Sequence, residues 1–160
     1  MREILDFCEG QPRESRPGGE VLLRESETTN RLYVLVSGKV EVLRGETQVA
    51  VLAEPGSILG DMSILMQSPH TATVRALGPV EVFAIEDGSG FFRDHPQAAF
   101  HVARMLAHRL NAATTYLADL KRQFADKADH LGMVGNVLES LIYRQRPRPE
   151  PGSERNPRGP

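Results

Sequence analysis

The chain has 160 residues, of which 40% are hydrophobic and 25% charged, and its formal net charge is −2. This length fits one domain with an appendage, and a charge so near zero gives no electrostatic case for nucleic-acid binding by the whole chain. The single cysteine, Cys8, excludes an intrachain disulfide. Acidic residues stand where a secretory signal would be apolar, and no run of 18 apolar residues occurs. We therefore expect a cytoplasmic protein that does not cross a membrane.

Residues 11–87 are predicted to form short strands separated by Gly, Pro and Asn. Residues 39–43 alternate polar and apolar side chains, which is typical of a half-buried strand, and residues 44–46 resemble a hairpin tip. The strands expected from this pattern cover residues 31–36, 39–43, 48–52 and 80–85. Several short strands at regular spacing predict a β-sandwich or barrel.

From Gln97 the period of the hydrophobic pattern becomes helical, with apolar or small residues alternately three and four positions apart. This seam consists of Ala103, Leu106, Leu110, Ala113, Leu117, Leu120 and Phe124, and its register continues through Leu131, Val134, Leu138 and Leu141. A heptad seam predicts a long helix that pairs with a partner helix. Gly132 and Gly135 would each cost about 1 kcal/mol inside a helix. A break near residues 129–135, which would give two helices, is therefore the alternative.

One segment combines features that suit a ligand with a phosphate and a ribose. Residues 59–65 read Leu-Gly-Asp-Met-Ser-Ile-Leu, and residues 68–74 read Ser-Pro-His-Thr-Ala-Thr-Val. Small residues and one carboxylate end a predicted strand, and a short turn with hydroxyl side chains follows. Backbone N–H groups at a helix N-terminus suit an anion. The carboxylate could accept hydrogen bonds from ribose hydroxyls.

This segment resembles the phosphate-binding cassette of cyclic-nucleotide-binding domains, whose pattern is roughly Phe-Gly-Glu-Leu/Met-Ala-Leu and then Pro-Arg-Ser/Thr-Ala-Thr-Val. Residues 32–42 resemble the strand signature of that family, and residues 55–61 resemble its Pro-Gly turn before the cassette. The resemblance covers most of residues 12–124. It implies a mainly β fold, a jelly roll or double-stranded β-helix barrel with flanking α-helices. The architecture it resembles most is that of catabolite-activator-type bacterial regulators, in which a long C-terminal helix pairs with its twin.

The resemblance divides the chain into three parts. Residues 1–96 are predicted to form the β-roll, residues 97–146 the long dimerisation helix, and residues 147–160 a disordered, proline-rich tail. Regulators of this type carry a helix-turn-helix domain after the long helix, whereas only residues 143–160 follow here. We therefore expect no DNA binding by this chain alone.

Eight residues match ligand contacts of the family. They are Gly60, Asp61, Met62, Ser63, His70, Thr71, Ala72 and Thr114. Asp61 replaces a Glu that binds the ribose 2′-hydroxyl, and its alternative role is to cap the next short helix. His70 replaces an Arg that pairs with the cyclic phosphate. Histidine is charged only below about pH 6.5, so its alternative role is that of a polar residue in a degenerate pocket. Thr114 would reach the base, or would only flank the helical seam.

The sequence thus predicts a non-catalytic sensor of the cAMP or cGMP class, with no metal and no cofactor. The ligand would act on the C-terminal helix, through which the chain would form a homodimer and address a downstream protein. The alternative is an interaction module that has lost nucleotide binding because His70 replaces the arginine. A cupin-like metal enzyme is disfavoured, because His70 is the only histidine among the predicted strands.

Overall fold

The computed structural model describes residues 3–124 and 128–143. The helices are α1 (Glu3–Asp6), α2 (Asp61–Met66), α3 (Gly88–Asp94), α4 (Pro96–Gln123) and α5 (Ala128–Tyr143). The strands are β1 (Arg13–Arg16), β2 (Val21–Leu23), β3 (Leu32–Ser37), β4 (Val40–Arg44), β5 (Thr47–Leu52), β6 (Ile58–Leu59), β7 (Thr73–Ala76) and β8 (Val80–Ile85). The chain divides into two compact units, at Met105 and Leu106. None of the described helices is both long and apolar enough to cross a membrane.

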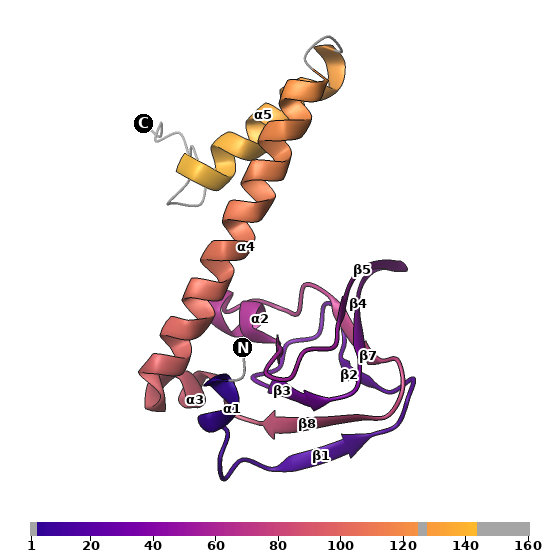
Figure 1. Cartoon of the computed structure of the whole chain (residues 1–160), viewed down its shortest axis with the longest axis vertical. Coiled ribbons are helices and arrows are strands. Elements are labelled where there is room, and N and C mark those ends of the chain that lie inside the picture. The colour runs from indigo at the N-terminus through magenta and orange to yellow at the C-terminus, as the bar shows by residue number, and fades with distance from the viewer. Residues whose placement is uncertain (1–2, 125–127, 144–160) are drawn as a thin grey trace, which may run out of the picture. The chain divides into compact units, whose positions relative to one another are not determined.

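The strands form two four-stranded antiparallel sheets, with the orders β1-β8-β3-β6 and β2-β7-β4-β5. In each sheet, strands from the first half of the roll lie beside strands from its second half, which is the strand order of a jelly roll. The strands can be followed in Figure 1. The predicted mainly β jelly roll is confirmed. The two sheets remain separate within the described residues, so the roll is a sandwich and not a closed barrel. The hairpin tip is also confirmed, because Arg44 pairs with Thr47.

The core of the roll lies between the two sheets. Both sheets contribute its buried side chains, which are Leu23, Tyr33, Leu35, Val40, Leu59, Val74, Ala76, Val80, Val82 and Ala84. Strand β3 is buried from Leu32 to Leu35, so both of its faces are covered, although strict alternation would bury only one. Burying such aliphatic side chains contributes about 1.5–3 kcal/mol each, and this core fixes the register of the strands that hold the cassette.

Helices bury a second apolar layer beside sheet β1-β8-β3-β6, where Figure 1 shows α1 and α3. Its members are Ile4, Cys8, Phe91, Phe92, Ala98 and Val102. Cys8, predicted to be a buried small side chain, is fully buried, and its thiol lies 3.3 Å from the backbone oxygen of Ile4. Burial raises the pKa of the Cys8 thiol to about 11, so the residue is an unreactive part of the core.

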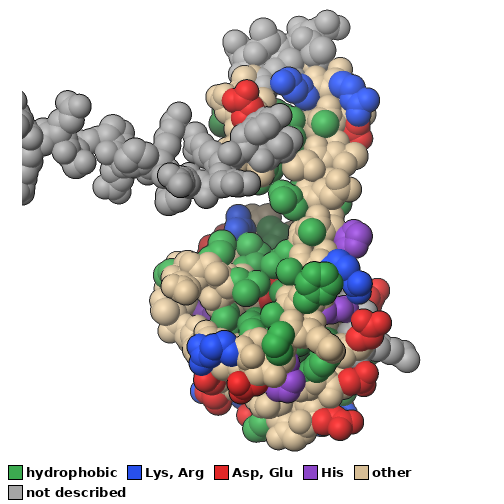
Figure 2. Space-filling view, turned by 90° about the vertical axis from the view of Figure 1, so that its left-hand side faces the viewer, with side chains coloured by type: hydrophobic (Ala, Val, Ile, Leu, Met, Phe, Trp, Pro, Cys, Tyr) green, Lys and Arg blue, Asp and Glu red, His purple; other side chains and the backbone are tan. Residues whose placement is uncertain are grey.

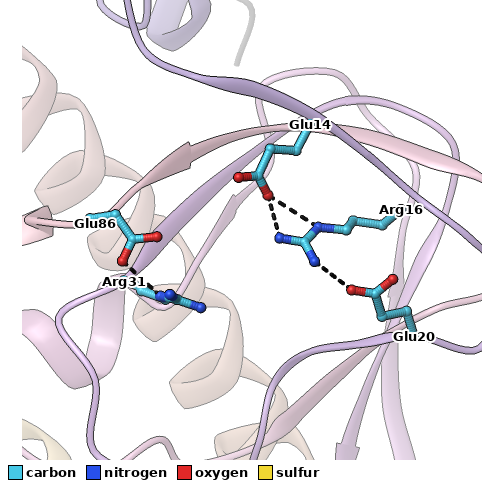
Figure 3. A network of polar contacts seen from close by, with 5 residues as sticks. All are labelled: Glu14, Arg16, Glu20, Arg31 and Glu86. Carbon is cyan, nitrogen blue, oxygen red and sulfur yellow. Dashed lines mark hydrogen bonds and ion pairs between the residues drawn. The ribbon is translucent and has the colours of Figure 1, made fainter.

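Strand β1 has the sequence Arg-Glu-Ser-Arg and was not predicted as a separate strand. It lies at the edge of its sheet and pairs only with β8 among the described strands. Figure 3 shows its polar support: Arg16 binds Glu14 from its own strand and lies 2.5 Å from Glu20. Arg13 lies 2.7 Å from Glu81 of the neighbouring strand. Strand β1 has no apolar face, so it is held by its backbone hydrogen bonds to β8 and by these ion pairs.

The helical part consists of two helices and not one. Helix α4 ends at Gln123 and α5 begins at Ala128, so the interruption precedes the 129–135 segment where the glycines predicted it. Gly132 and Gly135 lie inside α5, and a side-chain carbon on Gly135 would contact Lys121 of α4 at 3.4 Å. That contact is with the terminal nitrogen of the flexible Lys121 side chain, so it does not require glycine at position 135. The predicted tail, residues 147–160, lies outside the described residues, as does the side chain of Leu131.

Candidate functional site

The cassette begins where strand β6 turns into helix α2, at Gly60. The backbone of Gly60 has φ of 95°, in the left-handed region, and forms the N-cap of α2. A side-chain carbon there would lie only 2.7 Å from the backbone oxygen of Arg31. Both observations require glycine at this position. Close contact with Arg31, the residue before strand β3, therefore fixes the point at which the N–H groups of α2 begin.

Asp61, Ser63 and Ile64 lie on the buried face of helix α2, and its other residues are exposed. Asp61 and Ser63 are each 5% exposed, whereas Met62 is 39% exposed. The carboxylate of Asp61 is thus held in the first turn of a helix, where a negative charge is favourable. Leu65 and Met66 are also exposed, and Figure 2 shows hydrophobic side chains gathered on one face of the roll.

His70 lies between two hydroxyl groups that come from different segments. Its Nδ1 atom is 2.9 Å from the Oγ of Ser63 in α2, and its Nε2 atom is 2.7 Å from the Oγ1 of Thr29 in the loop between β2 and β3. The residue is only 4% exposed. Burial lowers the pKa of the imidazole from its ordinary value of 6.5, although the nearby charge of Glu27 opposes this. At neutral pH His70 is therefore an uncharged link between helix and loop.

Backbone hydrogen bonds hold the turn after α2 against the same loop. The N–H of His70 donates to the oxygen of Glu27, and the N–H of Ser26 donates to the oxygen of His70, both at 2.8 Å. One step further along, the N–H of Glu25 donates to the hydroxyl of Thr73 at 3.0 Å. Three hydrogen bonds thus hold the end of the cassette, at His70 and Thr73, against the loop that carries Thr29.

The structure brings most of the predicted site residues together. Gly60, Asp61, Met62 and Ser63 start α2, and Thr71 and Ala72, both half-buried, follow His70 on the way to β7. Thr114 belongs to the second unit, and its hydroxyl lies 3.0 Å from the carbonyl oxygens of Leu110 and Asn111 in its own helix. Its predicted contact with a base stays a prediction.

Thr29 was missed by the sequence analysis. It lies in the polar segment Arg24–Arg31, which contains two further hydroxyl residues and no motif. Only the folded structure shows that its hydroxyl contacts His70. No metal site accompanies the cassette: within the part of the chain that the structure describes, no three His, Cys, Asp or Glu side chains are grouped to hold an ion.

A jelly roll with a short helix between β6 and β7, followed by long helices, is the β-roll architecture that the sequence predicts. Residues 13–89 match the family model described as "Cyclic nucleotide-binding domain", and this match includes the whole cassette. Over these residues the chain therefore matches the cyclic nucleotide-binding domain family.

Two curated relatives and one solved structure, each a bacterial protein, are similar to this chain. The Cyclic AMP receptor protein of Thermus thermophilus is 31% identical over 103 residues, which are 61% of this chain and 48% of the relative. A CRP-like cAMP-activated global transcriptional regulator of Mycobacterium tuberculosis is 28% identical over 110 residues, 65% of this chain and 49% of the relative. The catabolite activator protein structure from Thermus thermophilus matches with a TM-score of 0.62 and 30% identity, covering 75% of this chain and 60% of that one. The chain spans about half the length of these two curated relatives.

Proposed function

We propose that this chain is the ligand-sensing part of a regulator, and that its cassette binds a cyclic nucleotide of the cAMP or cGMP class without catalysing a reaction. The observation that carries the proposal is the arrangement at Gly60. There a left-handed glycine starts α2, which carries the buried Asp61 and whose Ser63 contacts His70, the residue before Thr71 and Ala72. The N–H groups suit a phosphate, and the carboxylate suits ribose hydroxyls.

The nucleotide would act on the helices that follow the roll. We propose that α4 carries the response and that two copies of the chain pair through the seam on α4. In support, Leu110 and Phe124 are exposed at 44% and 46%, and the only buried residues of α4 are Ala98 and Val102, near its start. The other leucines of the stripe, Leu106, Leu117 and Leu120, are half-buried, so the chain covers the stripe only in part, and this favours association with a second copy.

The state of His70 favours a second candidate function. Both ring nitrogens already have hydroxyl partners, and the imidazole is neutral at neutral pH, so it supplies no fixed positive charge to a phosphate. The second candidate is therefore an interaction module that no longer binds nucleotide. In that case the His70→Arg variant would gain a binding activity that the parent chain lacks.

A thermal-shift panel on the purified chain separates the two candidates. 3′,5′-Cyclic AMP and 3′,5′-cyclic GMP should raise the midpoint of unfolding in a concentration-dependent way, because a ligand that binds only the folded state stabilises it. Adenosine, which has no phosphate, tests whether the phosphate is needed. 5′-AMP, whose phosphate is not cyclic, tests whether the cyclic form is needed. A midpoint that none of these ligands moves, in a sample with a cooperative transition, would favour the interaction module.

A further inference from the structure

The donor and the acceptor in each hydrogen bond around His70 can be assigned from the backbone groups at the two ends of the series. The hydroxyl of Ser63 lies 2.9 Å from the carbonyl oxygen of Gly60, an atom that can only accept. The single proton of that hydroxyl is therefore donated to Gly60. The Oγ of Ser63 must then accept its second hydrogen bond from the Nδ1–H of His70.

The other end of the chain of hydrogen bonds agrees with this direction. Neutral imidazole with its proton on Nδ1 has a lone pair on Nε2, so the hydroxyl of Thr29 donates to it. The Oγ1 of Thr29 in turn accepts from the backbone N–H of Arg31 at 3.3 Å. A directed relay thus runs from the backbone of Arg31 through Thr29, His70 and Ser63 to the carbonyl of Gly60, at the first residue of the cassette.

We propose that this relay makes His70 a proton-controlled group that sets the affinity of the cassette for an anionic ligand, with Thr29 as its positioning residue. The proposal rests on the proposed ligand function. With Nδ1 already protonated, His70 can take up a proton only at Nε2. The hydroxyl oxygens of Thr29 and Ser63 can both accept, so both N–H groups of imidazolium have acceptors, and the hydroxyl proton of Thr29 then turns away from Nε2.

A proton on His70 would add a positive charge, and no other side chain of the cassette segment supplies one. Residues 55–74 contain one carboxylate, Asp61, and no lysine or arginine. On the facing loop, Glu27 favours the protonated imidazole, and Glu27 itself pairs with Arg24 at 3.5 Å. The side chain of Arg31 is engaged with Glu86 at 2.9 Å (Figure 3). Protonated His70 would therefore give the cassette a positive charge that attracts the phosphate and that neutral His70 lacks.

Nitrogen-15 NMR of the imidazole tests the relay without any ligand. We expect His70 to be in the Nδ1–H form at pH 7.5, and an Nε2–H signature would overturn the assignment. Thr29→Val should lower the pH at which His70 titrates by about one unit, because a charged N–H that loses its acceptor costs more than a neutral lone pair that loses its donor. Thr29→Ser should restore the titration. Identical titrations in the valine and parent proteins would overturn the role of Thr29.

Calorimetry with 3′,5′-cyclic AMP at pH 5.5, 6.5 and 7.5 tests the control of affinity. Binding coupled to uptake of one proton tightens by up to tenfold for each unit of falling pH. The parent chain should show this slope, His70→Arg should bind with no slope in this range, and His70→Gln should bind weakly with no slope. A parent chain that binds equally at all three pH values would overturn the proposal. If neither the parent nor His70→Arg binds, the proposed ligand function fails, and the NMR result decides the relay by itself.

Discussion

A side-chain carbon on Gly60 would lie 2.7 Å from the backbone oxygen of Arg31, and the backbone of Gly60 is already in the left-handed region. Gly60→Ala should therefore destabilise the roll by about 3 kcal/mol, from strain at positive φ and from the shift of strand β3 that the clash requires. Gly19→Ala is the matched control, because Gly19 has φ of 86° with open space around it, and should cost about 1 kcal/mol. Urea unfolding measures both. Equal losses would show that the contact with Arg31 is unimportant.

His70 should make the folded state less stable in mildly acidic solution. Its folded-state pKa is lowered below 6.5, so the unfolded chain binds the proton more readily. Stability is then fully present above about pH 6.5 and falls as the pH drops through the lowered pKa. In His70→Gln this decline should be absent, while the decline caused by carboxylates at lower pH remains. Thermal unfolding between pH 5 and 8 checks this, and parallel curves for the two proteins would contradict it.

Glu41 is a buried carboxylate with two partners on the outer side of sheet β2-β7-β4-β5. Its side chain accepts from Gln48 at 2.7 Å and from the Nε of Arg75 at 2.7 Å, and these bonds lower the pKa of Glu41 below its ordinary 4.5. Stability from this group is present above pH 4.5 and is lost as the pH falls through the lowered pKa. Arg75→Gln should therefore destabilise the chain at pH 7, because a buried carboxylate loses its charged partner.

The control for Arg75 is the exposed ion pair between Arg13 and Glu81, whose side chains are 53% and 41% exposed. Solvent screens such a pair, so Arg13→Gln should change the free energy of unfolding much less than Arg75→Gln. Urea unfolding at pH 7 compares the two variants. A larger loss for Arg13→Gln would mean that burial of Glu41 does not govern the result.

The fold was predictable in the strands whose polar and apolar side chains alternate and in the segments that contain the family motifs. Strand β1 was not, because its four polar residues show no apolar face and its stability comes from β8 and from the ion pairs of Arg16. The glycines predicted a break near residues 129–135, whereas both lie inside α5, which begins at Ala128; a glycine costs only about 1 kcal/mol inside a helix. In the cassette, Gly60 and His70 were visible in the sequence, whereas Thr29 comes from 41 positions away and carries no local signal.

The seam on α4 should hold two copies of the chain together. Leu110 is 44% exposed, and Leu110→Glu would place a charge in the apolar stripe, so this variant should be monomeric. Thr115→Glu is the matched control, because Thr115 is exposed on the opposite side of the helix from the seam and its change should leave the dimer intact. Light scattering after gel filtration measures both masses. A monomeric parent chain, or a dimer of Leu110→Glu, would contradict the seam.

The central claim is that the cassette binds a cyclic nucleotide, and calorimetric titration of the folded chain with 3′,5′-cyclic AMP and 3′,5′-cyclic GMP tests it most directly. We expect saturable binding of at least one of them. Asp61→Asn should weaken it about tenfold or more, because a charged acceptor for the ribose hydroxyl is lost. Asp94→Asn, the same change at an exposed carboxylate of α3, should bind like the parent. No heat from either nucleotide between pH 5.5 and 7.5, or equal affinity in Asp61→Asn and the parent, would contradict the account.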